Sequence, residues 1–105
     1  MENLQRTNHP TIADDFAATI HRFISTDLAA RIAMLIGDTD QATALGKRAE
    51  AIRAAFKHEF FAPSGRIAHN DQTSWSLAFL YGLVPPEYYE AGKAYFRRVV
   101  EEADG

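Results

Sequence analysis

Several residue types and patterns are missing from this chain, and each absence narrows its function. No cysteine occurs among the 105 residues, so neither a disulfide bond nor a thiolate metal site can form. The 11 basic residues are outnumbered by 14 acidic ones, which argues against a nucleic-acid partner. No apolar run approaches the roughly 20 residues of a membrane span, and the first residues lack the layout of a signal peptide. We therefore expect a cytoplasmic protein that binds neither membrane nor nucleic acid.

The composition is that of a folded protein with one domain. Hydrophobic residues make up 47% and charged residues 24% of the chain, which are ordinary values for globular proteins. A chain of this length can bury roughly two thirds of its unfolded surface, which is enough for one core. Residues 1–10 are polar and end at a proline, so we expect a flexible tail there. Residues 11–105 are expected to form a single helical domain.

A long apolar stripe with helical spacing predicts a first helix that begins at Thr11 and ends before Gly37. Thr11 is a suitable N-cap with Asp14 three residues later, and Gly37 suits the position after a helix end. The segment can form one helix or two joined near residues 25–27, and we favour one. His21 lies beside the stripe and is expected to be a partly buried packing residue. The stripe consists of Ile12, Phe16, Ile20, Phe23, Ile24, Leu28, Ile32, Leu35 and Ile36.

Caps, apolar stripes and stop signals indicate three further helices. The second follows Asp38, buries one face and ends near Phe60. The third runs from Gln72 to Tyr81 with almost no charge, so we expect it to be buried on all sides. The fourth begins at Pro86. Its inward side chains are expected to be Tyr89, Tyr95, Phe96, Val99 and Ala103. Together these signals predict an all-α fold with about four helices in two antiparallel hairpins.

Four segments of the chain carry a resemblance to a known family. They are Ile52–Phe56, Phe60–Arg66, Asn70–Thr73 and Tyr81–Glu87. In this order and spacing they resemble the catalytic domain of bacterial α-L-rhamnosidases, and the resemblance extends over about residues 29–103. It implies that the chain is a segment of an (α/α)6 barrel of six helical hairpins, with a helical bundle as the alternative. It also implies inverting hydrolysis of terminal α-L-rhamnosides, with carboxyl groups as general acid and general base.

The loop before the third helix is the candidate substrate-binding site. It consists of His69, Asn70, Asp71 and Gln72, with Trp75 one turn into the helix. The resemblance implies that the substrate pocket lies at one end of the inner helices. There the loop can hydrogen-bond to sugar hydroxyl groups, and Trp75 can offer an apolar ring to a sugar face. The alternative is structural: Asn70 or Asp71 caps the helix, Gln72 satisfies loop amides, and Trp75 packs in the core.

No catalytic residue is assigned within this chain. Inverting hydrolysis needs two carboxyl groups roughly 6.5–9.5 Å apart, and Asp71 is the only acid at the expected end of an inner helix. The motifs that carry the pair in the resembling family have no counterpart in this sequence. The four histidines form no His-Glu-x-x-His arrangement, and we expect neither a metal nor a cofactor.

The length of the chain leaves two hypotheses for its function. A complete six-hairpin barrel is several times longer, so the chain is expected to be a rhamnosidase fragment that does not catalyse alone. In a complete barrel its ligand would be a rhamnose-containing glycoside. The alternative is a non-catalytic interaction module that forms a homo-oligomer or pairs with a partner helical chain. In both cases we expect exposed apolar side chains to form an interface, most simply with two-fold symmetry. The side chains expected there are Phe16, Ile20, Phe23, Trp75 and Phe79.

Overall fold

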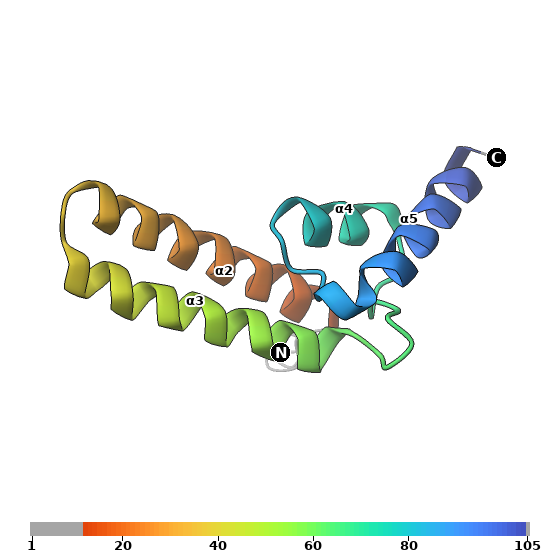
Figure 1. Cartoon of the computed structure of the whole chain (residues 1–105). Helices are drawn as coiled ribbons and strands as arrows, with labels where there is room; N and C mark the ends of the chain where they lie inside the picture. Colours follow the sequence, from red (N-terminus) through yellow and green to blue (C-terminus); the bar gives the residue numbers. More distant parts are fainter. Residues whose placement is uncertain (1–11, 105) are drawn as a thin grey trace, which may run out of the picture.

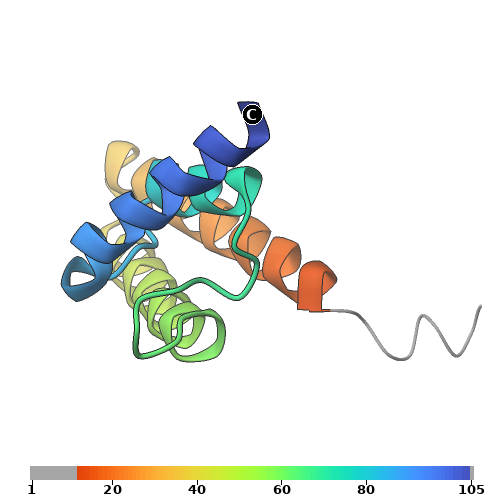
Figure 2. The same ribbon diagram turned by 90° about the vertical axis from the view of Figure 1, so that its right-hand side faces the viewer.

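A computed structural model describes residues 12–104, which form helices joined by short connections. The helices are α2 (Ile12–Leu35), α3 (Thr39–Phe60), α4 (Gln72–Leu80) and α5 (Tyr89–Asp104), and a 3-10 turn η1 (Pro86–Tyr88) leads into α5. Helices α2 and α3 form a long antiparallel hairpin, and α4 and α5 form a second pair at one end of it (Figure 1 and Figure 2). The prediction of an all-α fold with four helices in two pairs is confirmed for these residues.

The ends of the helices follow the signals in the sequence. Gly37 has φ of 83° and Gly82 has φ of 69°, in the left-handed region that glycine adopts without a steric cost. After Gly82, the Leu83 amide donates to the Ala78 carbonyl at 2.8 Å, and this bond closes the last turn of α4. Both glycines therefore stop their helices as predicted. Leu83 folds back and is almost completely buried.

Helix α2 is continuous from Ile12 to Leu35, which confirms the choice of one helix. The predicted tail of residues 1–10 and the predicted N-cap Thr11 lie outside the described residues. The side chain of Asp14, its proposed capping partner, also lies outside the part whose side chains the structure describes.

The core lies where the two helix pairs meet. Phe16 of α2 packs on Phe56 of α3, with 5.3 Å between ring centroids. Phe61 continues this contact to Trp75 of α4 at 6.0 Å, and Trp75 stacks on Tyr95 of α5 at 5.9 Å. Phe56 and Trp75 have no exposed surface. The prediction that Phe16, Ile20, Phe23, Trp75 and Phe79 form an exposed interface is therefore wrong: the first four are buried, and Phe79 is half-buried.

The outer half of α2 faces away from the core, which is the opposite of the prediction. Leu28, Ile32 and Leu35 are 52%, 57% and 84% exposed. Ala33 is buried instead, and so is Ala42 of α3, because these small residues lie between the two helices. The second helix pair covers only the first half of α2 (Figure 1). Beyond that cover, only the side toward α3 can be buried, so the large side chains on the other side stay in solvent.

Helix α4 is not buried on all sides, and this prediction is also wrong. Trp75 and Ala78 are fully buried, but Leu80 is 73% exposed and Ser76 is exposed too. Helix α4 packs against α5, and its Trp75 also contacts Phe61 at the end of α3, while Leu80 and Ser76 lie on an open side. The apolar composition of α4 therefore predicts that the helix contributes to the core. It does not predict that one side of the helix lies at the edge of the core.

Three further side-chain positions differ from the prediction. His21 is exposed, because it lies on the outer side of α2. In α5, Tyr89 and Ala103 are exposed as well. They lie at the two ends of the helix, and the Tyr89 ring meets the Phe79 ring of α4 edge-on, with 5.2 Å between centroids. The inward positions that are confirmed, as buried or half-buried, are Tyr95, Phe96 and Val99.

Candidate functional site

The loop that precedes α4 starts from a tight turn after α3. Gly65 turns the chain with φ of 87°, and an antiparallel bridge joins Phe61 to Ile67. The Ala68 amide donates to the Phe60 carbonyl at 2.7 Å. Ile67 is 1% exposed, so this short extended piece, which the sequence predicts, fixes the start of the loop to the core.

Asn70 and Trp75 are joined by a hydrogen bond. The indole Nε1 of Trp75 donates to Oδ1 of Asn70 at 2.7 Å. The indole ring has no exposed surface and lies parallel to the Tyr95 ring, with 10° between the planes. Buried tryptophan nitrogens need such a partner, because an unpaired donor loses its bond to water. In the described part of the chain, the Trp75 ring therefore offers no open face to a ligand.

Asp71 caps α4. Its Oδ1 accepts a hydrogen bond from the Ser74 amide at 2.7 Å, and its carbonyl accepts from the Trp75 amide at 3.1 Å. A carboxylate also suits the positive end of the helix dipole. The side chains of Asp71 and Gln72 are both exposed. These two residues present the polar groups of the loop that face solvent.

His69 turns the other way, toward α2. Its ring meets the Phe16 ring edge-on, with 6.0 Å between centroids. Its Nε2 atom is buried and has no hydrogen-bond partner within the described residues. Buried polar atoms are usually paired, so this nitrogen is the least satisfied polar atom of the loop.

The residues of the candidate site therefore have different structural roles. Asn70 and Trp75 are brought together as a buried hydrogen-bonded pair, Asp71 holds the helix end, and His69 packs on Phe16. The remaining oxygen of Asp71 can accept a hydrogen bond, and the amide of Gln72 can both donate and accept. Asp71 is the one acid that the loop itself contributes.

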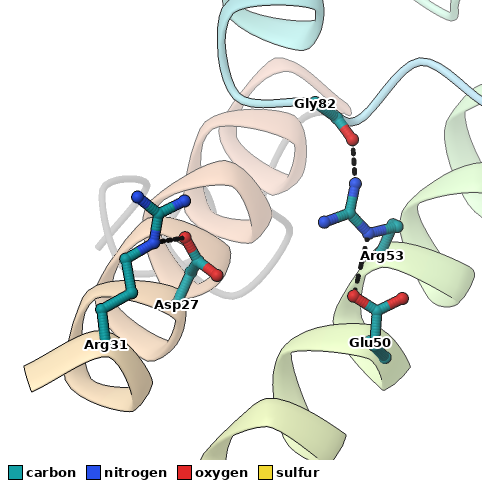
Figure 3. Close-up of polar contacts among 5 residues, drawn as sticks. All are labelled: Asp27, Arg31, Glu50, Arg53 and Gly82. Atoms are coloured by element: carbon teal, nitrogen blue, oxygen red, sulfur yellow. Dashed lines mark hydrogen bonds and ion pairs between the residues drawn. The ribbon is translucent and has the colours of Figure 1, made fainter. Parts of the chain in front are cut away.

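Two basic side chains of α3 connect the helix pairs, and the patterns in the sequence do not reveal this role. Arg53 Nη1 donates to the Gly82 carbonyl, and its Nε lies 3.3 Å from Oε2 of Glu50 (Figure 3). One turn later, Lys57 forms an ion pair with Glu87, whose hydrogen bond raises the pKa of Lys57. The same bond lowers the pKa of Glu87. Local sequence patterns assign such residues to the solvent face, because their partners lie far along the chain.

A cavity of about 630 Å³ opens near these contacts, between α2 and the C-terminal end of α4. Its walls include Leu28 of α2 and the exposed Leu80 and Tyr81. An ion pair between Arg31 Nε and Asp27 Oδ2, 3.1 Å apart, lies on the α2 side (Figure 3). The cavity is at the opposite end of α4 from the loop of residues 69–72, so it is separate from the candidate site.

The family model of the bacterial alpha-L-rhamnosidase 6 hairpin glycosidase domain matches residues 2–105. The chain belongs to this family of six-hairpin glycosidases. The resemblance in the sequence is confirmed, and the match also covers the first residues, which the resemblance from about residue 29 did not include. The two helical hairpins are thus a segment of a six-hairpin glycosidase domain.

The other comparisons do not extend this assignment to a particular glycosidase. Neither the curated proteins nor the solved structures gave a match to the chain. Among residues 12–104, none of the helices combines the length and the hydrophobicity that a membrane span requires.

Proposed function

We propose that this chain is a structural segment of a glycosidase domain whose complete form hydrolyses terminal α-L-rhamnosides, and that the segment does not catalyse alone. The observation that carries the proposal is the family match over residues 2–105. In the complete domain, α4 is an inner helix, and the loop at its N-terminus contacts the sugar.

The chemistry of the loop supports binding rather than bond cleavage. Inverting hydrolysis uses two carboxyl groups roughly 6.5–9.5 Å apart, one to protonate the leaving oxygen and one to activate water. The loop contributes only Asp71, and one of its oxygens already accepts the Ser74 amide. The other oxygen can accept a sugar hydroxyl, and the Gln72 amide can both donate and accept. The catalytic carboxyl groups then come from other parts of the complete domain.

The test combines turnover with binding. The purified chain is incubated with a chromogenic α-L-rhamnoside, and its amide NMR signals are followed during a titration with L-rhamnose. We expect no turnover, and shifts confined to the loop of residues 69–72. Asp71→Ser keeps an oxygen that can cap α4 but removes the carboxylate, so it should weaken these shifts. Asp38→Ser makes the same change at the cap of α3, where Asp38 accepts from the Gln41 amide, and should leave the shifts unchanged.

Two results would count against parts of this proposal. Turnover by the wild-type chain that disappears in Asp71→Ser would mean that the chain assembles a complete site. Rhamnose shifts that are absent, or that are equally weak in both variants, would remove the loop from substrate binding and leave the family membership as ancestry alone.

A non-catalytic interaction module is the second candidate function, and one observation favours it. Leu28, Ile32 and Leu35 form an exposed apolar row on α2, which we call the outer stripe. An interaction module predicts that changes in the outer stripe alter assembly, whereas L-rhamnose has no effect on the chain.

A further inference from the structure

We draw no further inference here: the strongest candidate, the cavity of about 630 Å³ between the outer stripe of α2 and the C-terminal end of α4, carries none, because its two arginines already pair with Asp27 and Glu50 of this chain and nothing in the structure shows what covers its apolar walls.

Discussion

Asn70→Ala should destabilise the fold by about 1–3 kcal/mol, the cost of a buried donor that loses its acceptor. The magnitude follows from the surroundings of Trp75. Its ring is 0% exposed, and its Nε1 donates to the Asn70 oxygen at 2.7 Å, so removal of that oxygen leaves a buried donor without its protein partner. Folded domains of this size are stable by roughly 5–15 kcal/mol, so the loss is a substantial share of the total.

A double-mutant cycle with Trp75→Phe isolates this hydrogen bond. Urea unfolding, followed by far-UV circular dichroism, gives the free energy of unfolding of the wild type, both single variants and the double variant. Trp75→Phe removes the donor, so Asn70→Ala should then cost much less than in the wild type. We expect an interaction energy of about 1 kcal/mol or more, and the packing loss of Trp75→Phe cancels in the cycle.

An Asn70→Ala cost below about 0.5 kcal/mol, with no interaction energy in the cycle, would refute this reasoning. The Asn70 side chain would then contribute nothing to the stability of the fold. In that case its oxygen would become available to a ligand, and the interpretation of the loop would shift from packing toward binding.

Three further changes test packing and charge, each through urea unfolding. Gly46→Ala should stabilise α3 by about 0.5–1 kcal/mol, because its Cβ meets nothing within 4 Å. Gly92→Ala should instead destabilise the fold by about 1–3 kcal/mol, because its Cβ would lie 2.9 Å from the Trp75 ring; equal effects of the two changes would contradict the packing of α5 on α4. Glu87→Gln removes the ion pair with Lys57, which lowers the pKa of Glu87 below 4.5 and raises that of Lys57 above 10.5. The wild type should therefore be more stable than Glu87→Gln by the full amount between pH 4.5 and pH 10.5. This difference should disappear as the pH falls through the folded pKa of Glu87. A difference that persists in strong acid would exclude the ion pair.

The ends of the helices could be predicted from the sequence because their signals are local. Asp38 and Asp71 each accept an amide three residues later, and Gly37 and Gly82 each end a helix. A capping side chain and a left-handed glycine act within one turn of the chain. These bonds need no information about the rest of the fold.

Local signals could not predict which face of the outer half of α2 is buried. An apolar stripe shows which side chains share a face, but the buried face depends on what lies beside the helix. The second helix pair covers only the first half of α2 (Figure 1). Phe23 is buried, whereas Leu28 and Ile32, farther along α2, are exposed. How far the second helix pair extends along α2 depends on the tertiary structure, namely on the nine residues of α4 and the position of its end.

The loop at the start of α4 shows the same limit at the level of single side chains. The cap at Asp71 is a local feature, and the sequence narrows it to two candidates, Asn70 and Asp71; the structure shows Asp71. The bond between Asn70 and Trp75, and the contact between His69 and Phe16, exist only because the helix pairs pack together. Three of the five candidate residues therefore hold the loop against the core.

The buried contacts of the loop bear on the sugar binding that we propose for it. Because His69 and Asn70 are fixed by buried contacts, the backbone of the loop is held in place before a ligand arrives. A held loop pays little ordering cost on binding, which favours even a few hydrogen bonds. The same contacts mean that changes at His69, Asn70 or Asp71 should alter folding together with the proposed binding. Gln72 is exposed and lies just after the cap, so it is the position where an effect on the proposed sugar binding can be separated from a loss of stability.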